Sequence, residues 1–342
     1  MKQIPSQLKL KTAKRAEDTW AQRSGSSEDI ALLYLAMLRA AGLSAYAMKV
    51  VDRERGTFDI TYLTLRQLDD TLVILSDGGK ESVLDPGEKM CPFQTVNWRH
   101  SGASGIRQSA EGRSTASTPL QNYPDNKTLR IGDVTLDDQG AVSASFRFVM
   151  TGQEALYWRQ KAIENDLDDV KKQFDESMEA VFPDGVAAHV DSFTALDDPD
   201  QSLIALVKAK GNLGLATSKR LLLPAYFFET RGAHPFVNQD KRQQPVDMHY
   251  GNLVTDQVTY HLPAGFSVEG APKDDKISWP DHAVLINKTA AAPDTVTIVR
   301  TLARAFTTAK PEEYQDLRGF YQKVAAADQG QLVLTSATSK GN

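Results

Sequence analysis

The sequence contains very little cysteine. Among its 342 residues there is one, Cys91, and a single thiol excludes an internal disulfide and any metal site built from several cysteines. Cys91 follows the turn-forming run Asp85-Pro86-Gly87, without the helix start that would lower the pKa of its thiol. We therefore interpret Cys91 as a structural residue.

The sequence also lacks long apolar runs and an excess of positive charge. No apolar run approaches the roughly 20 residues of a membrane-spanning helix, and residues 1–5 lack the apolar core of a signal peptide. The net charge of −5 argues against general nucleic-acid binding, which needs a basic face. We expect neither membrane insertion nor nucleic-acid binding, in a chain long enough for two or three domains.

Residues 25–42 predict one buried helix around which the first part of the chain is organised. Ser26 or Ser27 can accept hydrogen bonds from the free N–H groups of the first turn, and Glu28 and Asp29 place negative charge at the positive end of the helix dipole. The remainder is apolar on nearly every side, which is typical of an enclosed helix. Unpaired N–H groups at such a helix start stabilise an anion, but a serine such as Ser27 needs a base to take its proton before it can act as a nucleophile.

The rest of the first half predicts short strands and then a loop. Strand-like runs occupy residues 43–52, 72–75 and 82–84, and the last two flank a hairpin turn. Residues 101–125 are rich in Gly, Ser, Thr and Pro and show no periodicity, which is typical of a linker or a long surface loop. We therefore predict a first domain over residues 1–107 and a linker over residues 108–125.

The second half predicts a strand-rich domain over residues 126–335. Apolar and polar residues alternate in several segments, as in half-buried strands; these are residues 128–136, 141–150, 186–195, 203–209, 253–262, 282–287 and 295–303. One long amphipathic helix is predicted over residues 153–181 and a final helix over residues 311–327. The chain is therefore expected to be an α+β protein whose second domain is β-sandwich-like.

Three short patterns in the first domain carry a family resemblance. The run Gly25-Ser26-Ser27-Glu28-Asp29 precedes the apolar helix, Leu38-Arg39-Ala40-Ala41-Gly42 ends it, and Leu84-Asp85-Pro86 follows the third strand. This order resembles the papain/transglutaminase-like core of the transglutaminase-like superfamily. The resemblance implies a catalytic cysteine at the position of Ser27, a histidine at that of Asp70 and an aspartate at that of Asp85. Two of these three positions are changed here.

The resemblance extends toward the C-terminus. Residues 91–102 and the pattern Tyr314-x-x-Leu317-Arg318-x-Phe320-Tyr321 are similar to segments of a bacterial subgroup of that superfamily. In this subgroup the core lies between β-rich flanking domains of unknown function, usually in larger exported proteins. The resemblance therefore implies a periplasmic or secreted protein, and the N-terminal domain usual in the subgroup is missing from this chain.

The changed positions favour a pseudoenzyme, because a cysteine transferase depends on a thiolate paired with an imidazolium. We expect a groove at the start of the central helix that binds a peptide, a protein or a small acyl ligand, without a cofactor. Its predicted lining is Ser27, Glu28, Asp70, Asp85 and Trp98. In the simplest interpretation Ser27 only caps the helix and His100 is a surface residue.

Two enzymatic alternatives remain open. In the first, Ser27 attacks an amide, ester or phosphoester while His100 acts as base and Asp85 orients its ring. In the second, a metal ion is bound in the second domain, where Asp247 and His249 would share one face of an extended strand. Both alternatives make the chain a hydrolase, the first acting at the start of the central helix and the second in the second domain.

Overall fold

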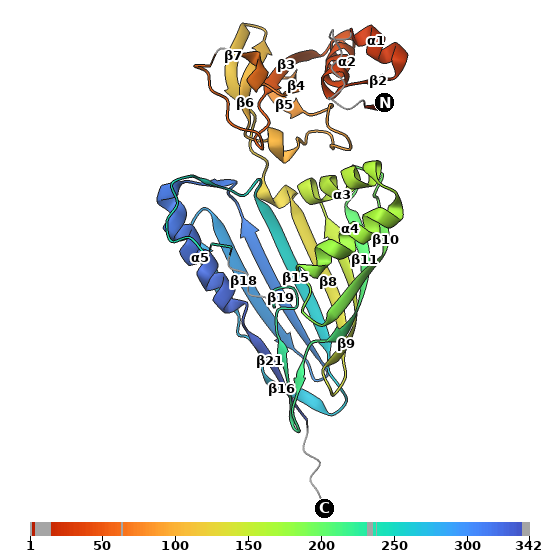
Figure 1. Cartoon of the computed structure of the whole chain (residues 1–342), viewed down its shortest axis with the longest axis vertical. Coiled ribbons are helices and arrows are strands. Elements are labelled where there is room, and N and C mark those ends of the chain that lie inside the picture. Colours follow the sequence, from red (N-terminus) through yellow and green to blue (C-terminus); the bar gives the residue numbers. More distant parts are fainter. Residues whose placement is uncertain (1, 4–14, 63, 231–234, 237, 337–342) are drawn as a thin grey trace, which may run out of the picture. The chain divides into compact units, whose positions relative to one another are not determined.

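The computed structural model describes residues 2–3, 15–62, 64–230, 235–236 and 238–336. The chain divides into two compact units, one made of residues 1–121 with 198–200 and the other of residues 122–197 with 201–342 (Figure 1). None of the helices in the described ranges is long and apolar enough to cross a membrane. The predicted α+β class is confirmed, because helices and mainly antiparallel sheets occur together in each unit.

Within its described residues, unit 1 has two α-helices and, as its main sheet, a five-stranded antiparallel one. The helices are α1 (Ala16–Gln22) and α2 (Ser27–Ala40). The sheet has the order β5-β4-β3-β6-β7, with β3 (Ser44–Val50), β4 (Asp70–Asp77), β5 (Lys80–Leu84), β6 (Ser104–Ser109) and β7 (Gly112–Ser117). The smaller elements are β1 (Lys2–Gln3), β2 (Ser24–Gly25), η1 (Leu65–Gln67) and η2 (Trp98–His100).

The central helix α2 buries one face rather than being enclosed on all sides. Its residue Leu35 packs with Ala45, Val73 and Leu84 of the sheet, and Ala31 is fully buried. Met37 on the last turns is 50% exposed. The prediction of complete enclosure was wrong because Met37 and Ala40, near the C-terminus of α2, lie at the surface.

The predicted linker is largely a β-hairpin. β7 pairs with β6, and β6 pairs with β3, so residues 104–117 extend the sheet of unit 1. Nearly every side chain of β7 is exposed. Because neither face of this edge strand is buried, it shows no apolar alternation, and composition alone therefore indicated a loop.

Unit 2 is built on an eight-stranded sheet with the order β10-β11-β9-β8-β15-β19-β18-β17. Its strands are β8 (Lys127–Leu136), β9 (Ala141–Met150), β10 (Val186–Thr194), β11 (Leu203–Asn212), β15 (Asn252–His261), β17 (Asp275–Trp279), β18 (Ala283–Ala291) and β19 (Thr295–Arg304). They match the predicted strand segments within a few residues, apart from β17, which was not predicted. β8 and β15 pair in parallel.

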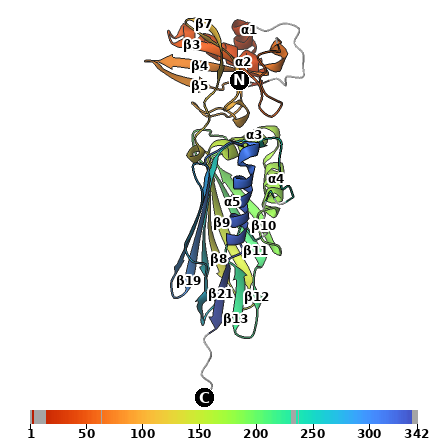
Figure 2. The same cartoon turned by 90° about the vertical axis from the view of Figure 1, so that its left-hand side faces the viewer.

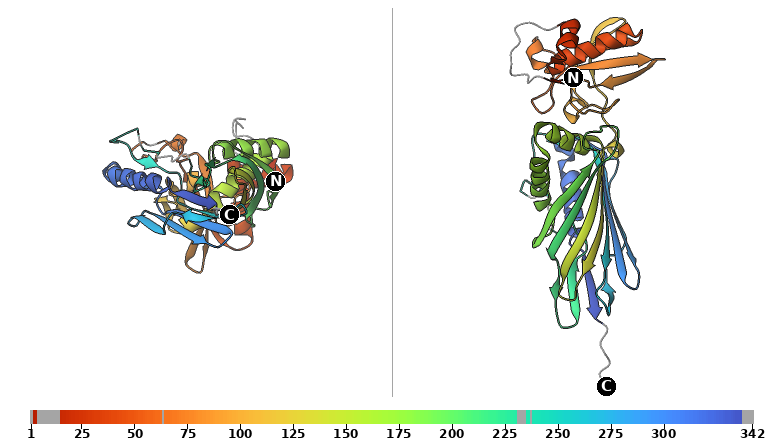
Figure 3. Two further views of the ribbon diagram at one scale, coloured as in Figure 1. Left: turned by 90° about the horizontal axis from the view of Figure 1, so that it is seen from below. Right: turned by 90° about the vertical axis from the view of Figure 1, so that its right-hand side faces the viewer.

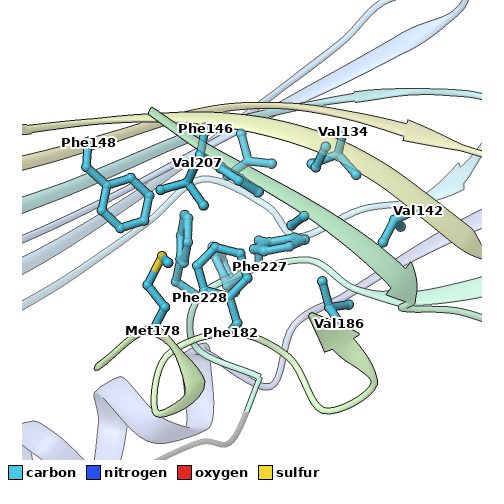
Figure 4. Close-up of a cluster of buried hydrophobic side chains, with 14 of the residues drawn as sticks. Val134, Val142, Phe146, Phe148, Met178, Phe182, Val186, Val207, Phe227 and Phe228 are labelled. Carbon is cyan, nitrogen blue, oxygen red and sulfur yellow. The ribbon is translucent and has the colours of Figure 1, made fainter. Parts of the chain in front are cut away.

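A second, smaller sheet packs against one face of the large sheet. It has the order β12-β13-β21-β16, with β12 (Leu215–Ala216), β13 (Arg220–Pro224), β16 (Phe266–Gly270) and β21 (Gln331–Ser336). Side chains from both sheets join one core cluster, whose aromatic centre is drawn in Figure 4. There the Phe146 ring lies 4.8 Å from the Phe227 ring and 5.4 Å from the Phe182 ring, centroid to centroid. Aromatic pairs at such distances add about 0.5–1.5 kcal/mol each beyond burial.

The long helix predicted over residues 153–181 is two helices, α3 (Gly152–Glu164) and α4 (Leu167–Glu179). Asn165 is extended, and the Asp166 side chain accepts a hydrogen bond from the Asp169 N–H, which starts a new helix. The apolar spacing continues through this break, so periodicity did not reveal it. Figures 2 and 3 show both helices on the same side of the large sheet as the C-terminal helix.

That C-terminal helix, α5 (Tyr314–Ala327), confirms the helix predicted over residues 311–327, of which the first turn is the 3-10 helix η4 (Pro311–Glu313). The side chains predicted to face inward are buried: Tyr314, Leu317, Phe320, Tyr321 and Val324. They pack on Trp279 and Leu285 of the large sheet. The remaining short elements of unit 2 are η3 (Tyr123–Asp125), β14 (Val246–Asp247) and β20 (Thr308–Ala309).

Candidate functional site

The start of α2 is capped by Ser26, not by Ser27. The Ser26 Oγ accepts a hydrogen bond from the Asp29 N–H at 3.2 Å, and the Asp29 Oδ2 accepts one from the Ser26 N–H at 2.9 Å. This reciprocal pair is a capping box. Ser27 is the first helical residue, so the interpretation of Ser27 as the cap was wrong, and its hydroxyl has no part in the capping box.

The two serines are therefore expected to differ in their effect on stability. Ser26→Ala should lower the free energy of unfolding of unit 1 by about 1 kcal/mol, because it removes the acceptor for a first-turn N–H. Ser27→Ala should change this free energy by less than about 0.5 kcal/mol, because the Ser27 hydroxyl takes no part in the cap and substitutions away from caps and cores usually have small effects. Urea unfolding of the two variants measures both, and an equal loss in both would contradict this assignment of the cap.

The turn that follows β5 packs directly against the start of α2. A Cβ atom placed on Gly87 would lie 2.8 Å from the Ser27 carbonyl oxygen and 3.2 Å from the Ser27 Cβ. Only a residue without a side chain fits this approach. The Asp85–Glu88 turn, at the position of the predicted Leu-Asp-Pro pattern, is thereby held beside Ser27.

His100 lies between the carboxylates of Asp70 and Asp85. Its Nδ1 is 2.7 Å from Asp85 Oδ2 and its Nε2 is 3.2 Å from Asp70 Oδ2. The Asn97 N–H donates to the same Asp85 oxygen at 3.1 Å. Asp70 opens β4 and Asp85 directly follows β5, and these paired strands bring both carboxylates to one end of the sheet. His100 is 3% exposed, so the interpretation of it as a surface residue was wrong.

This environment favours the charged form of His100. Burial alone would lower its pKa, but hydrogen bonds to Asp70 and Asp85, together with their charges, outweigh burial and raise the pKa to about 10. For Asp70, burial acts to raise the pKa, but the hydrogen bond and the charge of His100 outweigh it and leave the pKa below its usual value. His100 is thus an imidazolium at neutral pH, with both ring nitrogens directed at carboxylates.

Glu88 is a site residue that the sequence did not reveal. Burial, with a contribution from the charge of Asp85, raises the pKa of Glu88 to about 7. In sequence it is one acidic residue after a Pro-Gly turn, which more often lies in solvent. Only its position beside Asp85 and His100 distinguishes it.

Asp85, Glu88 and His100 place one donor atom each within 4.8 Å of one another, and they are the only such group of three among the described residues. Carboxylate oxygen and imidazole nitrogen are ligands for several divalent metals. A metal here would have to displace the proton that His100 shares with a carboxylate, because a ligating imidazole is neutral.

The other predicted lining residues lie in the same unit. Glu28 forms an ion pair with Lys49 at 2.6 Å, and Trp98 is on η2 with the Arg99 guanidinium 5.6 Å from the centre of its ring.

The Cys91 Sγ donates to the Thr95 carbonyl at 3.3 Å, and burial raises the pKa of this thiol. These contacts give Cys91 a structural place in the loop.

Asp247 ends the two-residue strand β14, and His249 does not continue this strand as predicted. His249 has a left-handed φ of 64° after the end of β14, and its N–H donates to the Asp247 Oδ1 at 2.7 Å. Both residues are exposed. Within the described ranges they belong to no group of three metal-ligating side chains.

Comparison with known proteins gives one family match and one structural match. Residues 219–334 match DUF3858, described as a domain of unknown function with a solved structure. The fold is similar to the crystal structure of a candidate protease from Parabacteroides distasonis, with a TM-score of 0.50 and 14% identity, covering 98% of this chain and 49% of that protein. No curated protein matches the sequence. The chain thus spans about half the length of the structural match, and at this identity the likeness shows a shared fold alone.

Proposed function

We propose that this chain is a transglutaminase-like protein without acyl-transfer activity, which binds a peptide, a protein or a small acyl ligand at the start of α2. The observation that carries this proposal is the placement of His100 between Asp70 and Asp85, at 3.2 and 2.7 Å. The fold likeness to a candidate protease and the motif resemblance around Ser27 and Asp85 support the choice of superfamily.

Acyl transfer requires a base that is unprotonated at the working pH. An imidazolium whose pKa is about 10 holds its proton at neutral pH and cannot accept one from Ser27. Asp70, at the position where the resemblance implies a histidine, has a lowered pKa and is a weaker base than a free carboxylate. A serine without a base is a poor nucleophile, so this geometry supports binding.

The same residues suggest what a ligand would offer. Asp70, Asp85 and Glu88 lie around His100, and the Asp70 side chain, which also feels the charges of Lys49 and Arg99, is 27% exposed. Accessible carboxylates accept hydrogen bonds from N–H groups and attract ammonium groups. We therefore favour a peptide, whose amide N–H groups or amino terminus would contact Asp70, over a purely apolar acyl chain.

A hydrolase using Ser27 is the second candidate function. One contact favours it: the Asp85 carboxylate lies 2.7 Å from His100 Nδ1, as in an aspartate–histidine pair that orients a catalytic ring. For catalysis the ring would have to lose its proton and turn Nε2 from Asp70 toward Ser27. The two candidates therefore differ in the protonation state of one imidazole.

The test is the titration of His100 by NMR in the full chain, with the signal assigned from His100→Gln. We expect a protonated ring that does not titrate between about pH 5.5 and 8.5, because both neighbouring carboxylates hold the proton. Asp70→Asn should lower its pKa, since one of the two charges is removed. Titration near the ordinary value of about 6.5 would contradict the proposal.

The activity arm uses a panel of chromogenic esters, amides and phosphoesters with Ser27→Ala as the control. We expect no hydrolysis above background in either protein. A rate that falls at least about a hundredfold in Ser27→Ala, equivalent to about 2.7 kcal/mol of lost transition-state stabilisation, would establish the hydrolase instead.

A further inference from the structure

Unit 2 contains a cavity of about 330 Å³ beside the hairpin formed by β17 and β18. It is lined by residues of β17, the turn Pro280-Asp281-His282, β18, β19 and η3. Ligand sites in proteins usually measure about 300–1,000 Å³, so the cavity has room for a small molecule. It belongs wholly to unit 2 and shares no residue with the site at the start of α2.

The floor of the cavity is apolar and lies on the face of the large sheet opposite the helices. Leu285 is fully buried and packs with α5, so its neighbours Val284 and Ile286 point to the other face. Val284 pairs with Ala303 of β19, and all three line the cavity. Aliphatic side chains from adjacent strands thus form a continuous surface.

Tyr123 of η3 forms the aromatic wall. A Cβ atom on Gly251 would lie 2.9 Å from the Tyr123 Cβ and 2.7 Å from the Arg304 carbonyl oxygen. The absence of a side chain at Gly251 lets Tyr123 pack closely beside the end of β19. The ring therefore stands next to the aliphatic floor, where it can cover a bound apolar group.

Two opposite charges line the same cavity. Lys276 is on β17 and Asp281 is in the turn, and within the described ranges neither forms an ion pair. The five residue steps between them correspond to at most about 16 Å of extended chain, and the turn with a left-handed φ of 61° at Asp281 brings the two residues closer than that. His282 is engaged elsewhere: its Nδ1 is 2.8 Å from the Pro280 carbonyl oxygen and its ring stacks on Trp279 at 4.1 Å.

We propose that this cavity binds a short peptide with free ends and apolar side chains. Its carboxylate would pair with Lys276, its ammonium group with Asp281, and its side chains would contact Val284, Ile286 and Tyr123. An extended peptide covers at most about 3.3–3.6 Å per residue, so a peptide of up to about four residues fits within the upper limit set by the chain between the charges. A ligand with one charge would leave one of the two rim groups without a partner.

The test is calorimetric titration of the full chain with the tripeptide Val-Ala-Val and with its N-acetyl and C-amide forms. We expect the free peptide to bind and each blocked form to bind at least about tenfold more weakly. In Lys276→Gln the C-amide form should bind as well as the free peptide. In Asp281→Asn, where asparagine tolerates the left-handed φ of 61°, acetylation should make no difference.

Two controls separate this site from others. Lys288→Gln removes an exposed lysine of β18 that does not line the cavity, and it should leave binding unchanged. Asp70→Asn changes the site in unit 1, so loss of binding in Asp70→Asn with full binding in Lys276→Gln would overturn this inference. Absence of binding at about 1 mM peptide, or equal affinity for free and blocked forms, would overturn it as well.

Discussion

His100→Ala is expected to lower the free energy of unfolding of unit 1 by about 3–5 kcal/mol at pH 6, the usual cost of removing one partner from a buried ion pair. The substitution leaves the buried Asp85 carboxylate and the partly buried Asp70 carboxylate without their shared cation. Urea unfolding, monitored through hydrogen exchange in β3, β4 and β5, measures the loss in unfolding free energy of this unit.

The matched control is His189→Ala. His189 Nδ1 lies 2.5 Å from Asp175 Oδ2, but the His189 side chain is 66% exposed. Exposed ion pairs contribute about 0–1 kcal/mol, so this variant should change stability little. Equal losses in the two variants would show that burial of His100 with Asp70 and Asp85 adds nothing to the free energy of unfolding.

The contribution of His100 to the free energy of unfolding should also fall as the pH rises. The folded pKa of His100 is about 10, above its unfolded value of about 6.5. Its stabilising contribution is therefore fully present below the unfolded value, declines above it and is lost as the pH rises through about 10. Glu88, whose pKa is raised to about 7, also favours the folded state less as the pH rises from about 4.5. The part of the difference between the original protein and His100→Ala that comes from the charge of His100 should consequently disappear in alkaline solution, which leaves the smaller cost of the lost packing.

Arg300→Met is expected to cost unit 2 about 3–5 kcal/mol. Arg300 donates from Nε to Asp328 Oδ1 at 2.7 Å and from Nη2 to Asp328 Oδ2 at 2.9 Å, and the side chains are 4% and 5% exposed. Glu229 is 3.5 Å from Arg300 and 3.5 Å from Arg130, which pairs with Asp256. Removing Arg300 leaves an excess of buried negative charge.

A double variant separates loss of the pair from loss of packing. Arg300→Met with Asp328→Leu should cost less than Arg300→Met alone, because no carboxylate is then left unpaired. Arg220→Met is the surface control, since Arg220 and Glu269 form an ion pair with both side chains exposed. Urea unfolding of the three variants measures these losses. A double variant less stable than Arg300→Met alone would contradict the expectation.

Local pattern was sufficient for much of the fold. β8 and β9 alternate buried and exposed residues along their length, and α5 repeats its buried residues at helical spacing. Such periods follow from backbone geometry and from one buried face, so they can be read without knowing the partners. The capping box at Ser26 is equally local, although only the structure decided which of two serines supplies it.

Features without one buried face escaped sequence analysis. β7 has almost no buried side chain, and the break between α3 and α4 depends on the conformation of Asn165 and the capping bond of Asp166 rather than on a change in apolar spacing. The sequence supplied the side chains Ser27, Asp70, Asp85 and His100 and their family resemblance. The contact of His100 with Asp70 and Asp85 joins residues 30 and 15 positions apart, and the buried position of Glu88 depends on that contact.

By itself, therefore, the sequence determined the α+β class, most strands, the terminal helix and the residues from which a site could be built. Only the tertiary structure decided that His100 is a buried imidazolium and that Glu88 belongs beside it. The reason is physical: secondary structure follows from neighbours along the chain, whereas burial and the proximity of charges, which set a pKa, follow from how distant segments pack.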